Sequence, residues 1–146
     1  ELRLRLNSGS RVTLGDRVES DGRVSITTGY SSRLNIGSGV YFNEGAVISC
    51  LGKIDIGDNT LFGPGVKIFD NNHRFSREEG VSRECAAGCI TVGRSCWIAS
   101  DVVLLKGAEI GDNCVIGAGC IIRGKVPAGS LVTRSGEQTT RPIETR

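Results

Sequence analysis

The sequence lacks several features that mark whole classes of protein. No apolar run approaches the roughly 18 residues of a membrane-spanning helix, and no basic-then-apolar signal segment opens the chain. The 18 lysines and arginines nearly balance the 16 aspartates and glutamates, whereas a nucleic-acid-binding surface carries a strong basic excess. We therefore expect a cytoplasmic protein with no integral membrane segment and no nucleic-acid partner.

Proline and aromatic side chains are also scarce. Three prolines against 21 glycines exclude a proline-rich disordered chain, and an aromatic content of 5% indicates a core built from Ile, Val and Leu. The 146 residues suffice for one domain with its own core. Six cysteines would fit a disulfide framework in a small secreted protein, but without a secretion signal we expect reduced thiols.

An apolar residue recurs every six positions along most of the chain. The rhythm begins at Ile36, slips by two residues after Ile48, pauses after Ile68 and runs unbroken from Val92. Its twelve positions are Ile36, Phe42, Ile48, Ile56, Phe62, Ile68, Val92, Ile98, Leu104, Ile110, Ile116 and Ile122. Glycine often follows the apolar residue, and a small or β-branched residue usually comes four positions after it.

A period of six fits neither an α-helix, at 3.6, nor strand alternation, at 2. It fits a chain that turns a corner every six residues, with glycine at the corner supplying conformations that other residues resist. Three such hexads make one triangular coil, and stacked coils pair as parallel strands roughly 4.8 Å apart. Cys96, Cys114 and Cys120 fall in the small inward column, where a thiol acts as a compact hydrophobe. The sequence therefore predicts an all-β triangular solenoid.

The chain is predicted to be a single domain, residues 1–146, with three parts. Residues 1–35 carry the rhythm weakly and are expected to form an N-terminal cap strand and imperfect coils. Residues 36–128 are expected to form regular coils, interrupted by one long polar loop at about residues 70–91. Residues 129–146 are polar and aperiodic, so we expect a C-terminal tail there.

The only histidine, His73, lies in that loop, within "IFDNNHRFS". An isolated histidine in a polar loop is by itself compatible with a solvated surface residue. Long excursions from a solenoid are, however, more often functional than decorative, and histidine titrates near neutral pH, as a general base must. Cys85 and Cys89 with one distant histidine are a weak signal for zinc, so no metal is expected.

Two segments resemble a known family. "IGDNTLFGPGVKIFDNNHRFS" and "ITVGRSCWIASDVVLLKGAEIGDNCVIGAGCIIRGKVP" are similar to the hexapeptide-repeat acyltransferases, in particular the sugar O-acetyltransferases of the maltose/galactoside and capsular-polysaccharide type. The resemblance covers roughly residues 34–128. It implies a left-handed parallel β-helix, an exception to the right-handed crossover preference. It also implies a homotrimer with active sites between subunits and acetyl-CoA lying along the coils.

The resemblance also implies roles for individual residues. It makes His73 the catalytic base, with Asp70 or a backbone carbonyl orienting its ring; Glu78 and Glu79 are alternatives unless they form a solvated charge cluster. It places Asn43 and Trp97, with Asp70, at the acceptor. Asn43 is equally explained by its tolerance of left-handed backbone at a corner, and Trp97 by covering the coil surface.

For the donor, the resemblance places Ser100 and Ala118 along the pantetheine arm of acetyl-CoA. A backbone N–H near Ser100 is a candidate for stabilising the oxyanion. Arg123 and Lys125 match positions near the CoA phosphates, although a solvated face explains them equally well. Relatives continue with a G-x-P-A-Lys/Arg turn at the nucleotide end of CoA; this chain departs from it, and Arg134 or Arg141 is the candidate substitute.

The resemblance implies an acetyl-CoA-dependent O-acetyltransferase that acts on a hydroxyl of a sugar or polysaccharide precursor by direct transfer, with His73 as general base. The alternatives are an N-acetyltransferase of an amino sugar, nucleotide-linked or free, and a non-catalytic β-helix scaffold. Relatives that acetylate nucleotide-linked amino sugars often carry an extra nucleotide-binding domain. No glycine-rich phosphate fingerprint follows a strand in this sequence, which favours O-transfer. Zinc carbonic anhydrases of this fold need three histidine ligands, and the chain has one.

Overall fold

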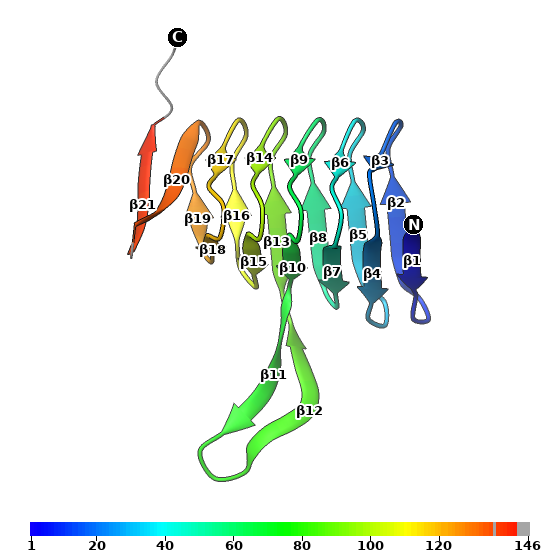
Figure 1. The fold of residues 1–146 in the computed structure, drawn as a ribbon. Helices are drawn as coiled ribbons and strands as arrows, with labels where there is room; N and C mark the ends of the chain where they lie inside the picture. The colour runs from blue at the N-terminus through cyan, green and yellow to red at the C-terminus, as the bar shows by residue number, and fades with distance from the viewer. Residues whose placement is uncertain (136, 143–146) are drawn as a thin grey trace.

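Three parallel β-sheets form the faces of a solenoid (Figure 1). The computed structural model describes residues 1–135 and 137–142, and these contain 21 strands. Within those two ranges the structure has no helix of the length and hydropathy that a membrane crossing requires. We call the three sheets faces A, B and C in the order in which the chain visits them, and name the corners A–B, B–C and C–A after the faces that they join.

Each face contains one strand from every coil, and face C has an additional antiparallel strand, β21. Face A consists of β1 (Leu2–Arg5), β4 (Val24–Thr28), β7 (Ala46–Cys50), β10 (Lys67–Phe69), β15 (Val103–Leu105) and β18 (Ile121–Ile122). Face B consists of β2 (Arg11–Leu14), β5 (Arg33–Ile36), β8 (Lys53–Ile56), β13 (Cys89–Val92), β16 (Glu109–Ile110) and β19 (Lys125–Val126). Face C consists of β3 (Glu19–Ser20), β6 (Tyr41–Phe42), β9 (Leu61–Phe62), β14 (Trp97–Ile98), β17 (Val115–Ile116), β20 (Ser130–Ser135) and β21 (Glu137–Pro142).

The register stacks the predicted apolar column on itself. Ile48 pairs with Ile68, which pairs with Leu104, and Leu104 pairs with Ile122 in the next coil. All twelve apolar positions are at most 4% exposed. The architecture confirms the left-handed parallel β-helix that the sequence and its family resemblance predict.

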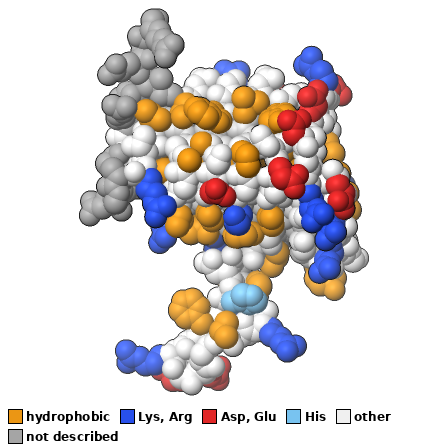
Figure 2. Space-filling model, in the orientation of Figure 1, with side chains coloured by type: hydrophobic (Ala, Val, Ile, Leu, Met, Phe, Trp, Pro, Cys, Tyr) orange, Lys and Arg blue, Asp and Glu red, His pale blue; other side chains and the backbone are white. Residues whose placement is uncertain are grey.

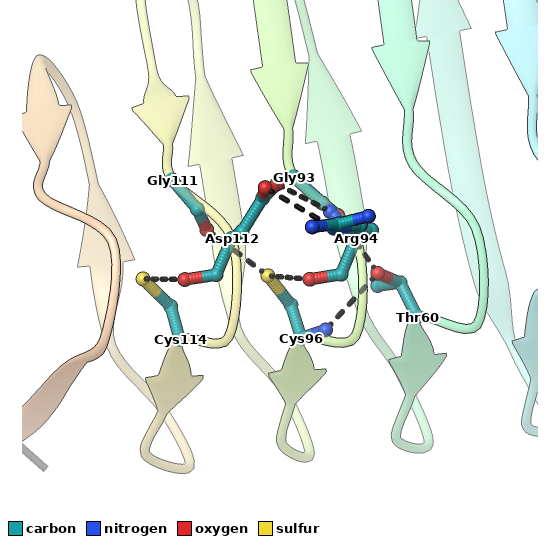
Figure 3. A network of polar contacts seen from close by, with 7 residues as sticks. All are labelled: Thr60, Gly93, Arg94, Cys96, Gly111, Asp112 and Cys114. Carbon is teal, nitrogen blue, oxygen red and sulfur yellow. Dashed lines mark hydrogen bonds and ion pairs between the residues drawn. The ribbon is translucent and has the colours of Figure 1, made fainter.

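The small inward column is buried as well. Cys96, Cys114 and Cys120 are at most 3% exposed and line the core, as expected of compact apolar side chains. Their sulfurs also donate to backbone carbonyls: the thiol of Cys96 lies 3.2 Å from the carbonyl oxygen of Gly111, one coil along (Figure 3). These thiols therefore serve packing.

Polar contacts tie successive coils together at the B–C corner (Figure 3). The buried Thr60 hydroxyl donates to the carbonyl of Gly93 (2.9 Å) and accepts from the backbone N–H of Cys96 (3.2 Å). One coil further, the backbone N–H of Arg94 donates to Oδ1 of Asp112 (2.9 Å). Each of these corners thus satisfies backbone groups of its neighbour, which holds the turns in a stack.

The glycine column has a different cause from the one predicted. Gly57 and Gly111 follow apolar residues and do not have positive φ; a Cβ on Gly57 would lie 2.5 Å from the backbone nitrogen of Arg94 in the next coil. The left-handed residues come two positions later, as at Asn59 (φ 55°) and Asn113 (φ 56°). Glycine is needed here because the corners of neighbouring coils touch, and asparagine tolerates the left-handed position.

Both ends depart from the predicted boundaries. Full burial begins with β4, so the regular coils start before residue 36, while β1 to β3 form an exposed first coil. The predicted tail is wrong at its beginning: β20 is the third side of the last coil, with Val132 fully buried, and β21 pairs with it antiparallel. Val132 pairs with Ile116 and so continues the buried apolar column of face C. Residues 136 and 143–146 of the predicted tail lie outside the described residues.

The long loop is a β-hairpin that leaves the solenoid at the A–B corner (Figure 1). Its strands β11 (Asn71–Ser76) and β12 (Gly80–Ala87) pair antiparallel, with a register shift between His73 and Phe75. The excursion is shorter than the predicted 70–91, because Asp70 is buried in the coil and Cys89 already pairs with Lys53 on face B.

Candidate active site

His73 stands on the exposed hairpin, outside the body of the solenoid (Figure 2). Its Nδ1 lies 3.1 Å from the carbonyl oxygen of Ser82 on the opposite strand. A carbonyl can only accept, so this contact requires the proton on Nδ1 and leaves the lone pair on Nε2. The backbone-carbonyl alternative for orienting the ring thus fits the geometry. Nε2 is free to act as a base toward a ligand outside the hairpin.

Asp70 has another role than the predicted one. Its side chain is completely buried, and its two carboxylate oxygens accept from the backbone N–H groups of Leu51 and Gly52, both at 2.8 Å. Asn71 donates to the same carboxylate at 3.1 Å. A side chain enclosed in this way touches neither an acceptor molecule nor the ring of His73. Asp70 instead fixes the corner from which the hairpin departs.

The other loop carboxylates also lie apart from the imidazole. Glu78 and Glu79 occupy the turn between β11 and β12, both exposed, and no contact within the described residues joins either to His73. Glu84 forms an exposed ion pair with Arg74 at 3.8 Å. The charge cluster at the hairpin tip is therefore solvated, which leaves His73 as the base candidate on this arm.

Ser100 and Ala118 lie at the C–A corner, one coil above the other. The backbone N–H of Gly119 donates to the carbonyl of Ser100 at 2.9 Å, which fixes this stacking. Ser100 is half-buried and Ala118 is exposed. In the preceding coil, Gly63 leaves room for them, since a Cβ there would lie 2.7 Å from the nitrogen of Ser100. The corner is a narrow wall of small residues, suited to a thin extended ligand.

Trp97 lies on the face C side of the same corner and is 54% exposed. It pairs with Leu61 in the coil before and Val115 in the coil after. Asn43, two coils before Trp97, is half-buried, and its Oδ1 accepts from the N–H of Glu44 at 2.8 Å. Asn43 is not left-handed, so its backbone does not explain its place at the corner.

Arg123 and Lys125 lie at the A–B corner of the last coil. Both are exposed, and Gly124 between them has a φ of 75°. They share this corner with the hairpin, two coils away. Arg134 was expected in the tail but is exposed on β20 in the last coil, and its Nη1 would lie 3.3 Å from a Cβ on Gly119, the residue next to Ala118. The other candidate, Arg141, has its side chain outside the described residues.

The predicted site residues therefore gather at two corners. His73, Arg123 and Lys125 lie at the A–B corner, whereas Ser100 and Ala118 lie at the C–A corner, with the full width of face A between them. Sequence reasoning missed the carbonyl of Ser82 and considered Cys85 only as a metal ligand, yet Cys85 Sγ lies 3.7 Å from Nδ1 of His73. Both contacts depend on the register of the hairpin, and no turn motif in the sequence predicts that register.

Comparison with known proteins agrees with this geometry. Residues 89–124 match the family model described as bacterial transferase hexapeptide (six repeats). The chain is 38% identical over 117 residues to the galactoside O-acetyltransferase of Escherichia coli K12, covering 80% of this chain and 58% of the relative. It is 37% identical over 101 residues to nodulation protein L of Rhizobium leguminosarum bv. viciae, covering 69% and 53%.

Solved structures share the fold. A hexapeptide-repeat-containing acetyltransferase from Vibrio cholerae matches with a TM-score of 0.76 at 22% identity, over 94% of this chain and 76% of that one. The same acetyltransferase complexed with acetyl-CoA matches with a TM-score of 0.66 at 19% identity, over 94% and 73%. The chain spans little more than half the length of the two curated relatives. The chain belongs to the hexapeptide-repeat transferase family.

Proposed function

We propose that the protein transfers the acetyl group of acetyl-CoA to a hydroxyl of a sugar or of a polysaccharide precursor. The observation that carries this proposal is the contact between Nδ1 of His73 and the carbonyl of Ser82, at 3.1 Å, which leaves Nε2 unprotonated on an exposed arm. A sugar hydroxyl is a poor nucleophile at neutral pH, so transfer needs a positioned base of this kind.

The proposed reaction is direct transfer in a ternary complex. The acceptor hydroxyl loses its proton to Nε2 of His73 as its oxygen attacks the thioester carbonyl and a C–O bond forms. Backbone N–H groups at the Ser100 corner stabilise the negative charge on the former carbonyl oxygen. The C–S bond then breaks, and the leaving CoA thiolate takes the proton back from Nε2. The bond formed, the bond broken and the proton are all accounted for without an acyl-enzyme intermediate.

Relatives support the choice of donor and acceptor. One relative is named a galactoside O-acetyltransferase, and a structural neighbour was solved with acetyl-CoA. In this chain the small residues Ser100 and Ala118 suit the pantetheine arm, and the exposed cations Arg123 and Lys125 suit phosphates. Trp97 offers an exposed aromatic face next to the pantetheine wall.

We propose further that the protein works as a homotrimer whose active sites lie between subunits. The outward side chains of face A include Val47, Phe69, Val103, Leu105 and Ile121. Face B instead presents charged residues such as Arg33 and Lys53 to solvent. If face A turns toward a three-fold axis, the A–B corner of one copy meets the C–A corner of the next, because face A separates those corners. Each cleft then gathers both groups of site residues.

The base is tested by thiol release from acetyl-CoA against a panel of sugars, oligosaccharides and amino sugars. Acceptor-dependent release is expected, and His73→Ala should lower it at least about 10²-fold. Cys89→Ala, which changes an exposed residue outside the hairpin, serves as the matched control. Undiminished release by His73→Ala would refute the base, and release with amino sugars alone would establish N-transfer instead.

Complementation tests the shared cleft. His73→Ala and Ala118→Trp chains are each expected to be inactive, the first for lack of a base and the second because the indole fills the pantetheine wall. Co-expressed, they should regain activity, since a mixed trimer contains clefts with an intact His73 from one copy and an intact Ala118 from the next. If both residues served one cleft from the same subunit, the mixture would stay inactive.

A further inference from the structure

The six cysteines of the chain divide sharply by accessibility. Cys50, Cys96, Cys114 and Cys120 are buried, and burial raises the pKa of the Cys50 thiol to about 12. A buried structural thiol is out of reach of reagents, so these four are inert packing groups. Cys85 is half-buried and Cys89 exposed, so these two are the thiols of the chain that reagents in solution can reach.

Cys85 lies against the imidazole of His73. The two residues are direct cross-strand partners in the hairpin, and Sγ of Cys85 is 3.7 Å from Nδ1. The next pair toward the tip is Phe75 with Val81, so the register shifts immediately after His73. The ring consequently reaches along β12 from Cys85 to the carbonyl of Ser82, and both contacts meet the same nitrogen.

These contacts matter because little else restrains the ring. The flanking residues Asn72 and Arg74 are exposed, as are residues 80–84 of the opposite strand, whereas Cys85 is half-buried. An exposed imidazole without a second contact rotates about its side-chain torsions and exchanges its proton between the two nitrogens. Sulfur is a weak acceptor, and at Nδ1 it favours the same tautomer as the carbonyl of Ser82 does.

We infer that Cys85 is a positioning residue for His73, and that a covalent adduct on its sulfur switches the ring out of its working state. This inference rests on the proposed role of His73 as base. The sulfur and the Ser82 carbonyl together hold the proton on Nδ1 and direct Nε2 away from β12. An adduct on Sγ adds atoms next to Nδ1, and the exposed ring is free to turn away from them.

Iodoacetamide is the probe of this switch. Its carbon forms a bond with Sγ, the C–I bond breaks, iodide leaves, and the thiol proton passes to solvent. The product carries an amide next to Nδ1 that both donates and accepts hydrogen bonds, so it competes with the Ser82 carbonyl for the ring.

The first test reads the imidazole directly and needs no activity. Because the chain contains one histidine, a long-range ¹H–¹⁵N spectrum of labelled protein at pH 8 shows a single ring without assignment. The wild-type spectrum should show a proton on Nδ1 and none on Nε2. Iodoacetamide treatment of the wild type and of Cys89→Ser, and the substitution Cys85→Ala, should each move the ring toward mixed tautomers. An unchanged ring in Cys85→Ala would overturn the inference, since the Ser82 carbonyl would then suffice.

The second test is kinetic. Cys85→Ala should lower kcat about 10-fold with little change in KM, and Cys85→Ser should recover most of that loss because its hydroxyl also accepts at Nδ1. Iodoacetamide should inactivate the wild type and Cys89→Ser but not Cys85→Ser. Equal inactivation of Cys85→Ser would place the sensitive thiol elsewhere and overturn the inference. If His73→Ala itself keeps full activity, the proposed role of His73 as base fails, whereas the spectroscopic test still decides the contact.

Discussion

Asp70 lies against Cys50 inside the solenoid, and neither side chain reaches solvent. The carboxylate accepts two backbone hydrogen bonds from the corner that follows Cys50, and the thiol donates to the carbonyl of Arg33 at 3.3 Å. Burial chiefly, and the neighbouring carboxylate next, raise the pKa of Cys50. This polar pair sits directly beneath the point where the chain leaves the coil for the hairpin that carries His73.

The substitution Asp70→Ala is expected to destabilise the protein by about 3 kcal/mol, because it leaves the half-buried N–H groups of Leu51 and Gly52 without their acceptors. Urea unfolding followed by circular dichroism measures the loss. Asp58→Ala is the matched control, since exposed Asp58 accepts one backbone bond, from Ser38 at 2.7 Å, and water can replace it. Its cost should stay below about 1 kcal/mol. Equal costs for the two variants would show that Asp70 is not the structural anchor.

Stability should fall with rising pH because of Cys50. The folded protein keeps this thiol protonated until about pH 12, whereas the unfolded chain releases its proton near the ordinary value of 9.0. Above pH 9 the unfolded state therefore binds fewer protons and is favoured progressively, and the contribution of Cys50 is lost between pH 9 and 12. Below pH 9 it is fully present.

The check is the free energy of unfolding measured with reductant from pH 8 to pH 10.5. Cys50→Ala should lower stability at pH 8, because a buried sulfur is removed, yet show a shallower decline above pH 9. The same slope in Cys50→Ala as in the wild type would remove Cys50 as the cause and leave the other buried thiols, such as Cys96, to explain it.

Much of the fold followed from the six-residue rhythm because that rhythm is local. Each corner places one apolar residue inward, so Ile98 or Ile116 can be assigned without knowing its neighbours in space. The cause of the glycine column could not be read in the same way. Position 57 requires glycine because the backbone of Arg94 lies against it in the next coil. Arg94 is 37 positions away in the sequence, on the other side of the hairpin. The contact exists only once the coils are aligned.

The site was harder to predict than the fold. A lone histidine in a polar loop identified His73, but its partners depend on a hairpin whose register shifts beside it. Asp70 was expected to orient the imidazole or to contact the acceptor, yet it is buried, as carboxylates seldom are unless paired. Its partners are backbone N–H groups 18 and 19 residues earlier, which no side-chain pattern marks.

Gly57→Ala should be more harmful than Gly80→Ala, although Gly80 has a positive φ of 71° and Gly57 does not. A Cβ on Gly57 collides with the backbone of the next coil, so coils must separate or the corner must distort. A Cβ on Gly80 meets nothing within 4 Å, so the cost is only that of left-handed backbone, about 1 kcal/mol. Thermal unfolding compares the two directly, and a larger loss for Gly80→Ala would contradict stacking as the reason for the glycine column.

Val103→Glu should dissociate the assembly without unfolding the subunit. Val103 points outward from the middle of face A, between Lys67 and Ile121, so a carboxylate there stays hydrated in the monomer but is brought near its symmetry copies in a trimer. Size-exclusion chromatography with light scattering should report a trimer for the wild type and a monomer for Val103→Glu. Activity should be lost with the trimer, because Nε2 of His73 then has no neighbouring Ser100 corner to face.

The matched control is Thr91→Glu, which changes an exposed, outward residue of face B and should remain an active trimer. If Val103→Glu stayed trimeric while Thr91→Glu became monomeric, face B and not face A would face the three-fold axis. The two groups of site residues would then have to come together in another way than the proposed cleft.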